Sequence, residues 1–275
     1  FSSNIPQYNP LDIINIIKSK LNDTDYEEIT PWYNGFTGKI IKLTDKSYIT
    51  KGKLILSLAL LEPGSISLEE PKIILSTKNK GYELNGKKIC VAYAKESSYI
   101  LVSCLLEKEV KLILINSEDP SINFTKLDST SGEPQYLVEF KNTQIGNNFT
   151  LSSDVISNKD ILKWIINRNT IGLCSFALGV NEESLKLTTS YTSQRIAFGV
   201  PVASFQAVSH KAADCYIGIA CFRAVTEQAI SKIVQNKCSD EAISIAKVWC
   251  GDVCHKVSYA SQHMHGGIGV DRAGI

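Results

Sequence analysis

The stretch with the clearest chemical pattern is residues 191–206, which read YTSQRIAFGVPVASFQ. A helical pattern continues to Arg195, stops within FGVP at 198–201 and starts again after Ser204. Gly and Pro so close together end a helix, because Gly tolerates the exit conformation and Pro moves the residue before it away from helical angles. We expect Ser204 to cap the next helix by accepting a hydrogen bond from one of its free N–H groups.

Arg195 would therefore lie at a helix end, beside the exposed N–H donors at the start of the next helix. A guanidinium group and a positive helix N-terminus that face one gap suit an anion, and a diphosphate above all. The alternative is a helix-turn-helix corner with an ordinary surface arginine. This stretch alone does not decide between the two interpretations.

Composition and charge exclude several classes of protein. The 29 basic and 28 acidic residues leave a net charge of +1, which gives no electrostatic argument for binding nucleic acid or an acidic membrane. No uninterrupted apolar run reaches the roughly 18 residues of a transmembrane helix. We expect a cytoplasmic protein with no nucleic acid and no membrane as partner.

The eight cysteines are too few for a disulfide scaffold in a chain of 275 residues. Cys250 and Cys254 stand at i and i+4, where two thiols could share a metal ion. No second pair of ligands has the spacing of a zinc site, so we interpret both as small buried thiols on a helix face and predict no metal.

Short strands are predicted before residue 154. Asn85-Gly86 predicts a hairpin turn between 82–84 and 88–93, because both positions tolerate positive φ. No helical pattern separates the strands, so we expect an antiparallel sheet that closes as a small barrel or sandwich. The other strand candidates are 54–61, 73–76, 99–105, 110–115 and 135–140.

From about residue 154 the hydrophobic period changes to 3.6 residues, and long helices are predicted at 160–195, 204–235 and 241–265. Asp240 is expected to cap the third helix and Gly266-Gly267 to end it. Short turns between long helices are typical of an up-down bundle. The predicted α+β chain has a truncated N-terminal helical segment at 1–51, a middle β-domain at 52–152 and a C-terminal helical bundle at 153–275 that lacks its last helix.

The string around Arg195 resembles a motif of the acyl-CoA dehydrogenase flavoproteins, which carry Arg, two spacers, Phe-Gly, a short Pro-containing turn and then Phe-Gln. Residues 263–269 are similar to the Gln-x-x-Gly-Gly-x-Gly of the same family, with His263 at the usual Gln position. Glycines there let a backbone approach a phosphate or ribose closely. The alternative is that Gly266-Gly267 only ends the helix.

Two stretches of the predicted β-domain also resemble motifs of this family. Residues 60–67 are similar to its flavin loop, with Leu61 in place of the usual Thr and Ser67 retained. Residues 85–92 are similar to its Asn-Gly-x-Lys-x-Trp-Ile-Thr strand beside the flavin ring, with Cys90 and Ala92 at the Trp and Thr positions. The resemblance covers about residues 52–275. In detail it looks like actinobacterial members that act as heteromeric pairs on steroid side-chain thioesters.

The resemblance implies FAD as cofactor, with Arg195 and Gln206 reaching the FAD of a neighbouring subunit. It also implies an acyl-CoA substrate, an acceptor of the electron-transfer flavoprotein type, and a homo- or hetero-oligomer, either a dimer or a tetramer. The implied cofactor-binding residues are Arg195, Phe198, Phe205, Gln206, His263, Gly266, Gly267, Ser67, Cys90 and Ala92.

The implied reaction is α,β-dehydrogenation of the thioester, in which a carboxylate removes the α-proton and the flavin accepts the β-hydrogen as hydride. Most members of the family place this base after the Gly-Gly-x-Gly segment, beyond Ile275. A minority place it near Asn169, whose amide cannot abstract the proton. No catalytic residue is therefore assigned.

Three functions stay open. The first is an FAD-dependent acyl-CoA dehydrogenase subunit, and the second is a non-catalytic partner subunit that completes the FAD site of its neighbour. The third is an oxidase or monooxygenase on the same fold. Compared with a typical member of the family, this chain favours the second function more strongly because it departs from the family pattern. The departures are at Leu61, Cys90, Ala92, His263 and Asn169.

Overall fold

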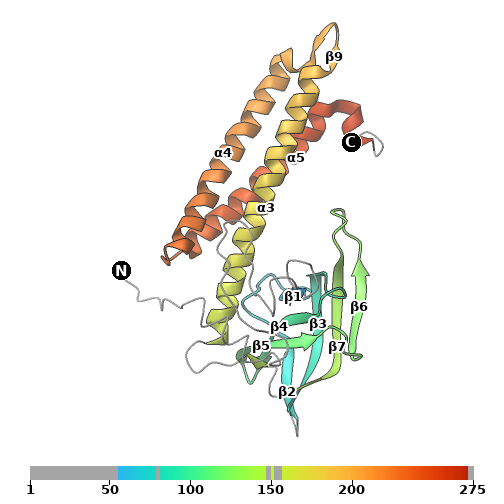
Figure 1. The fold of residues 1–275 in the computed structure, drawn as a ribbon, viewed down its shortest axis with the longest axis vertical. Coiled ribbons are helices and arrows are strands. Elements are labelled where there is room, and N and C mark those ends of the chain that lie inside the picture. The colour runs from blue at the N-terminus through green and yellow to red at the C-terminus, as the bar shows by residue number, and fades with distance from the viewer. Residues whose placement is uncertain (1–54, 79–80, 147–149, 152–156, 272–275) are drawn as a thin grey trace. The chain divides into compact units, whose positions relative to one another are not determined.

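The computed structural model describes residues 55–78, 81–146, 150–151 and 157–271 (Figure 1). It divides into two compact units, with the border between Ile166 and Asn167. The first is built around a β-sheet and the second from helices. The predicted N-terminal segment 1–51, its short helix and the predicted border at 152/153 lie outside the described residues.

The β unit holds one curled sheet with the strand order β6-β7-β3-β2-β4-β5-β8, and β1 pairs with β4. Most neighbours are antiparallel, whereas β1 and β2 each run parallel to β4. The sequence pattern predicted neither β6 nor β8. The strands are β1 (Leu56–Ala59), β2 (Ile74–Lys78), β3 (Gly81–Ala92), β4 (Tyr99–Leu106), β5 (Glu109–Asn116), β6 (Ile122–Leu127), β7 (Gln135–Ile145) and β8 (Thr150–Leu151).

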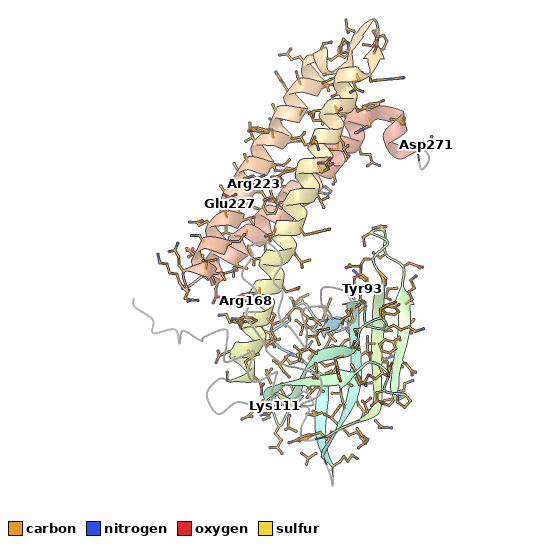
Figure 2. The ribbon with its side chains drawn as sticks, in the orientation of Figure 1. Tyr93, Lys111, Arg168, Arg223, Glu227 and Asp271 are labelled. Atoms are coloured by element: carbon orange, nitrogen blue, oxygen red, sulfur yellow. The ribbon has the colours of Figure 1, made fainter. Side chains whose placement is uncertain are left out.

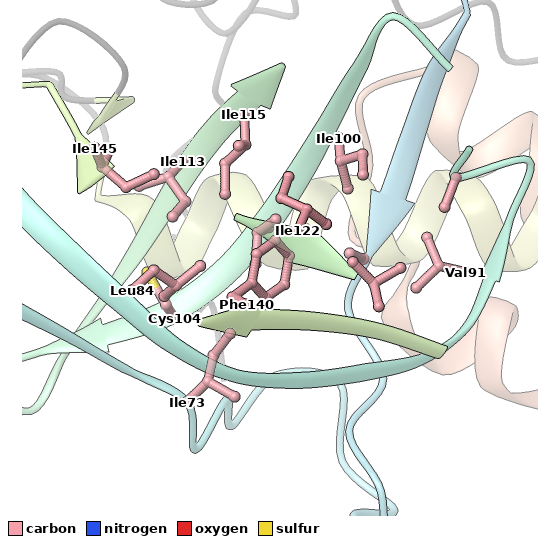
Figure 3. Close-up of a cluster of buried hydrophobic side chains, with 14 of the residues drawn as sticks. Ile73, Leu84, Val91, Ile100, Cys104, Ile113, Ile115, Ile122, Phe140 and Ile145 are labelled. Carbon is pink, nitrogen blue, oxygen red and sulfur yellow. The ribbon is translucent and has the colours of Figure 1, made fainter. Parts of the chain in front are cut away.

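Two apolar layers hold this sheet. Alternate residues of each strand point to one face, and on one face they form a core with Leu84, Val138 and Phe140 (Figure 3). On the other face Leu101 and Leu112 pack with the first turns of helix α3 (Asn158–Gln194). Strand β4 is buried on both faces, which explains its nearly continuous apolar sequence.

The prediction of a hairpin turn at Asn85-Gly86 is wrong, because β3 runs unbroken through both residues. Gly86 has φ 150°, and a Cβ atom there would lie 2.4 Å from Cγ2 of Ile73. The pairing with β7 shifts register between Leu84 and Gly86. The glycine therefore serves a bulge and a close backbone approach rather than a chain reversal.

Three long helices form the second unit, within a few residues of their predicted bounds. They are the rest of α3, then α4 (Gln206–Val234) and α5 (Asp240–His265). Their shared core contains Leu178, Phe222 and Val253, and Phe222 is fully buried. Figure 2 shows Arg223 and Glu227 one turn apart on α4, and their side chains approach to 3.6 Å. Within the described ranges, no helix has both the length and the hydropathy that spanning a membrane requires.

Two predicted helix caps are wrong. Ser204 lies in a short 3-10 turn, η2 (Val202–Ser204), where its hydroxyl donates to the carbonyl oxygen of Pro201 at 2.6 Å. The N-cap of α4 is Phe205, whose side chain caps nothing. Asp240 is the first residue of α5 and Ser239 its N-cap, and the Asp240 carboxylate accepts a hydrogen bond from the Asn167 amide at 2.8 Å.

Candidate functional site

The connection between α3 and α4 is a small β-hairpin of β9 (Ile196–Ala197) and β10 (Val200–Pro201) (Figure 1). Ala197 pairs with Val200, so Phe198 and Gly199 form the two-residue turn. Their φ angles are 54° and 82°, as a type I′ turn requires. A bulky residue is rare in this conformation, so Phe198 stores local backbone strain.

The Phe198 side chain is almost fully exposed, at 97%. Its ring meets that of Phe205 edge to face, with the centroids 6.3 Å apart. The hairpin therefore presents an aromatic pair to solvent at the start of α4.

Arg195 is the first residue after α3, and its main chain is fixed on both sides. Its N–H donates to the carbonyl oxygen of Tyr191, and its own carbonyl oxygen accepts from Val202, both at 2.8 Å. The side chain is exposed, and it makes no hydrogen bond or ion pair with any residue in the described part of the chain. The corner thus carries a positioned cation whose charge is not compensated.

A pocket of about 610 Å³ lies where the hairpin, the first turns of α4 and the end of α5 meet. Four of its lining residues are basic: Arg195, Lys211, His263 and His265. None of the lining residues carries a carboxylate. The others are Tyr191, Val202, Ala207, Val208, Met264, Gly266, Gly267 and Ile268. The fixed charges of the pocket, on Arg195 and Lys211, are therefore both positive.

The two histidines differ in their contacts. His263 accepts a hydrogen bond at Nδ1 from the Lys211 ammonium, at 3.2 Å, and stacks on Tyr259. Since an ammonium only donates, His263 is neutral in this arrangement, with its proton on Nε2. His265 faces the Ser261 carbonyl oxygen with Nδ1 at 2.7 Å and stacks on Tyr191. His265 therefore carries a proton on Nδ1.

Helix α5 ends at Gly266, as predicted, with φ 66°. The chain then turns back as η3 (Gly266–Val270), so closely that a Cβ atom on Gly269 would lie 2.4 Å from the Gln262 carbonyl oxygen. A Cβ atom on Gly267 would meet nothing within 4 Å. The Gly266-Gly267 backbone is thus open to close approach by a ligand.

Of the residues predicted on the helical unit, the structure brings Arg195, His263, Gly266 and Gly267 into one pocket. Phe198, Phe205 and Gln206 do not line it, and Gln206 faces His210, with the two Nε2 atoms 3.4 Å apart. Lys211 and His265, which also line the pocket, were not predicted from the sequence.

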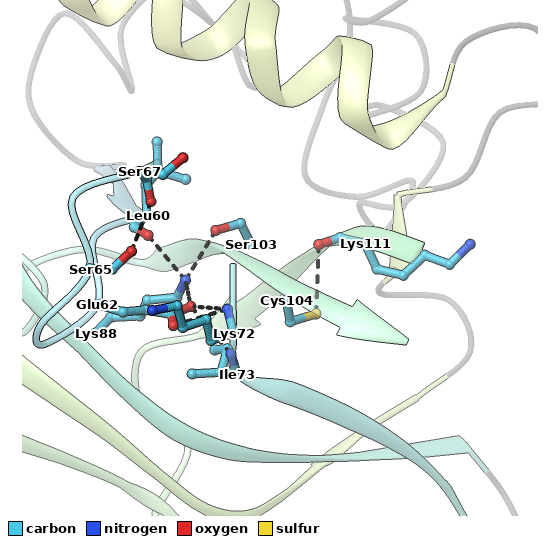
Figure 4. A network of polar contacts seen from close by, with 10 residues as sticks. All are labelled: Leu60, Glu62, Ser65, Ser67, Lys72, Ile73, Lys88, Ser103, Cys104 and Lys111. Carbon is cyan, nitrogen blue, oxygen red and sulfur yellow. Dashed lines mark hydrogen bonds and ion pairs between the residues drawn. The ribbon is translucent and has the colours of Figure 1, made fainter. Parts of the chain in front are cut away.

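In the β unit a buried ion pair fixes the loop at 60–67 against β3 (Figure 4). The fully buried Lys88 ammonium donates to Glu62 at 2.8 Å, and to the Leu60 carbonyl and the Ser103 hydroxyl at 3.1 Å each. Its three donors are thus all used. Burial lowers the pKa of Lys88 from its ordinary 10.5, and Glu62 opposes that shift.

Glu62 also binds the main chain at the start of β2. Its carboxylate accepts from the N–H groups of Lys72 at 3.0 Å and Ile73 at 3.3 Å. Ile89 donates to the Leu61 carbonyl oxygen at 2.9 Å, which adds a main-chain link from the loop to β3. The sequence analysis did not identify this pair, although both residues lie inside the two motifs.

The three predicted residues of the β unit lie on these two fixed segments. Cys90 is exposed, has φ 55° and sits where β3 again shifts register against β7. The Ala92 carbonyl oxygen accepts from Ser57 at 2.6 Å. The Ser67 carbonyl oxygen accepts from Ser65 at 3.2 Å. The bulge at Cys90 directs its thiol outward.

The three residues that were weighed as a catalytic base from the sequence are not suited to that role. Asn169 is exposed, Glu182 pairs with Arg223, and Glu183 pairs with Lys186 at 3.0 Å. These two carboxylates are therefore surface ion-pair partners.

The cysteine pair of α5 lies against α3. Cys250 and Cys254 have their sulfur atoms 3.9 Å apart, and Asn181 donates to Cys254 at 2.9 Å. Burial raises the pKa of Cys250 to about 12, which keeps it a thiol. Across the described residues, no three His, Cys, Asp or Glu side chains form a group that could hold a metal ion.

A curled sheet followed by a helical bundle with a basic pocket defines the chain as a two-part α+β protein, as predicted. Residues 160–275 match the family described as acyl-CoA dehydrogenase, C-terminal domain. The helical part of the chain thus resembles the C-terminal domain of the acyl-CoA dehydrogenases, a family of FAD-binding flavoproteins.

Individual relatives agree with this assignment. Acyl-CoA dehydrogenase FadE27 of Mycobacterium tuberculosis is 27% identical over 199 residues, which is 70% of this chain and 52% of the relative. Acyl-CoA dehydrogenase FadE28 of the same organism is 22% identical over 218 residues, which is 79% of this chain and 60% of the relative. The crystal structure of the ChsE4-ChsE5 complex from Mycobacterium tuberculosis matches with a TM-score of 0.74 and 26% identity, over 82% of this chain and 59% of that one. The chain thus spans about half to three fifths of these proteins.

Proposed function

We propose that this chain is a subunit of an FAD-dependent acyl-CoA dehydrogenase and that the basic pocket holds the diphosphate of FAD. The observation that carries the proposal is the convergence of four basic side chains, without a carboxylate, at the uncapped start of α4. The guanidinium of Arg195 can bind a phosphate through two parallel hydrogen bonds. The N–H groups of the first turn of α4 add donors and a partial positive charge.

For the β unit we propose a separate set of cofactor contacts, independent of the pocket on the helical unit. We assign Ser67, Cys90 and Ala92 to the flavin ring, on the loop and strand that Glu62 and Lys88 hold together. When bound, FAD supplies the acceptor for the hydrogen removed from the acyl chain. The residues of this chain position the cofactor and exclude water from it.

Phe198, Phe205 and Gln206 are proposed to contact the cofactor of a neighbouring subunit. They lie at the exposed hairpin and helix start rather than in the pocket. A further surface supports an oligomer, dimer or tetramer: Leu173, Phe176 and Val180 follow one face of α3 and are 52–72% exposed. The similarity to the ChsE4-ChsE5 complex motivates a hetero-oligomer as well as a homo-oligomer.

A second candidate function is a non-catalytic partner subunit. The observation that favours it is Asn169, whose amide stands near the position of the base in a minority of the family. In this role Arg195 and the Gly266-Gly267 turn would complete the FAD site of a catalytic neighbour.

The two functions make different predictions for the purified protein. Flavin absorbance and its bleaching by an acyl-CoA without oxygen would be recorded for the chain alone and with candidate partner subunits. Bleaching by the chain alone supports the dehydrogenase. Flavin binding and turnover only in the mixture support the partner subunit, whereas peroxide or a hydroxylated product would indicate the oxidase or monooxygenase class. An electron-transfer flavoprotein tests the proposed acceptor in the same assay.

A further inference from the structure

Lys211 is a cation of the pocket that no motif assigned. It lies in the second turn of α4, is half-buried as a residue and lines the pocket. It forms no ion pair with a carboxylate among the described residues. Its partner is Nδ1 of His263 at 3.2 Å, on the neighbouring helix α5.

A neutral imidazole directs an ammonium without cancelling its charge. The His263 ring is itself held against Tyr259, with the centroids 6.1 Å apart and the planes within 15°. Nδ1 accepts from Lys211, so Nε2 carries a proton and is a further donor. Lys211 is therefore oriented by α5 while keeping its full positive charge.

Two uncompensated cations in one pocket repel each other, and an anion that binds both removes this cost. A monophosphate concentrates its charge on one group, whereas a diphosphate carries two charged groups that can meet cations from different elements, here Arg195 after α3 and Lys211 on α4. We propose that Lys211, positioned by His263, is the second phosphate-binding residue of this pocket and makes it select a diphosphate over a monophosphate. The proposal rests on the proposed function, since the diphosphate is that of FAD.

The test compares ADP with AMP as probes, together with FAD, on the full protein in the assembly that binds flavin. Lys211→Met should weaken ADP and FAD binding by roughly tenfold, as expected for a charge-assisted hydrogen bond, and AMP binding less. The ADP-to-AMP preference should fall by a similar factor. Lys211→Arg should retain it. Lys232→Met, which removes the same charge from α4 outside the pocket, should leave all three affinities within twofold.

An unchanged ADP-to-AMP preference in Lys211→Met overturns the inference. If this variant does not fold, Lys211→Gln removes the charge but retains a donor for His263, and the same preference must fall. His263→Leu should also lower the ADP-to-AMP preference, because it removes the acceptor that orients Lys211 together with the donor at Nε2. Arg195→Ala separates the two proposals. If it weakens FAD binding and Lys211→Met does not, this inference alone fails. If neither variant weakens it, the proposed function fails.

Discussion

Arg195 is the residue on which the proposed cofactor site depends most. Its main chain is hydrogen-bonded on both sides, and its guanidinium is free of intramolecular partners among the described residues. Such a side chain adds little to folding, because it gains no contact when the chain folds. Its effect should therefore be visible in binding and not in stability.

The first prediction is that Arg195→Ala lowers FAD affinity by about 100-fold, the value of two hydrogen bonds to a charged group. The melting temperature should change little. Fluorescence titration with FAD and thermal unfolding measure the two quantities. Arg195→Lys keeps the charge and loses the second hydrogen bond, so its FAD affinity should lie between those of the wild type and Arg195→Ala. Equal FAD affinity in Arg195→Ala would refute the diphosphate assignment.

The second prediction concerns the buried pair of Glu62 and Lys88. Lys88→Met leaves the Glu62 carboxylate buried without its cation, which should cost about 3–5 kcal/mol of unfolding free energy. Combining it with Glu62→Gln should recover part of that loss, since the two residues are coupled. Urea unfolding of both single variants and the double variant measures this. If the stability changes of the two single variants simply added up in the double variant, the two residues would not be coupled.

The lowered pKa of Lys88 predicts the direction in which the stability of the protein changes with pH. Between its folded pKa and 10.5, the unfolded chain binds a proton that the folded chain has released. The contribution of Lys88 to stability therefore rises with pH in the window below 10.5. Urea unfolding at rising alkaline pH should show the wild type losing less stability than Lys88→Met. The opposite trend would mean that the pKa of Lys88 is raised.

At the scale of elements, the β9–β10 hairpin combines strain with exposure. Phe198 occupies a turn position that Asn or Gly prefers, and its ring is nearly all in solvent. Neither feature stabilises this chain. A contact outside the chain, as proposed for the cofactor or a neighbouring subunit, explains why an aromatic residue stands there.

The third prediction is that Phe198→Asn acts on stability and binding with opposite signs. Unfolding free energy should rise by about 0.5–1 kcal/mol, because Asn tolerates the left-handed conformation. FAD retention by the assembled protein should fall, because the exposed ring is lost. Thermal unfolding and flavin content after gel filtration measure the two effects. A decrease in stability, or unchanged flavin content, would contradict this account of the hairpin.

The fourth prediction contrasts two glycines. Gly86→Ala should cost about 1–3 kcal/mol, because its Cβ atom would overlap Ile73 at 2.4 Å in an unfavourable backbone conformation. Gly179→Ala lies within α3 with nothing within 4 Å and should stabilise by about 0.5–1 kcal/mol. Urea unfolding measures both. Similar effects at the two positions would remove the packing explanation for the bulge.

At the scale of the whole molecule, the exposed stripe of Leu173, Phe176 and Val180 on α3 bears on assembly. Apolar side chains spaced at three and four residues form one continuous helix face. Such a face costs free energy in water and is stabilised when a second surface covers it. A subunit of an oligomer is the occupant that the proposed function requires.

The fifth prediction is that Phe176→Asp lowers the order of the oligomer, because it places a charge within that face. Gel filtration with light scattering, carried out with the partner subunit where one is needed, measures the change in mass. Lys186→Asp, an exposed site on the same helix, is the control and should leave the mass unchanged. A wild-type monomer, or an unchanged mass in Phe176→Asp, would rule out this face as the interface.

Some helices and strands could be predicted from the sequence and others could not. Regular periodicity located all three helices of the second unit, because a long amphipathic pattern repeats over many turns. Strand β6 was missed because only Ile122 is buried in it, so its sequence lacks a clear alternation. Asn85-Gly86 was mistaken for a turn because bulges and turns favour the same residues.

The sequence alone determined the fold class and the family resemblance, because these depend on local patterns and short motifs. Only the tertiary structure decided which residues act together. It brought Arg195, Lys211, His263 and the Gly266-Gly267 turn to one pocket, and it buried Lys88 against Glu62. Those contacts join residues far apart in the chain. They depend on how helices and strands pack, which no local pattern records.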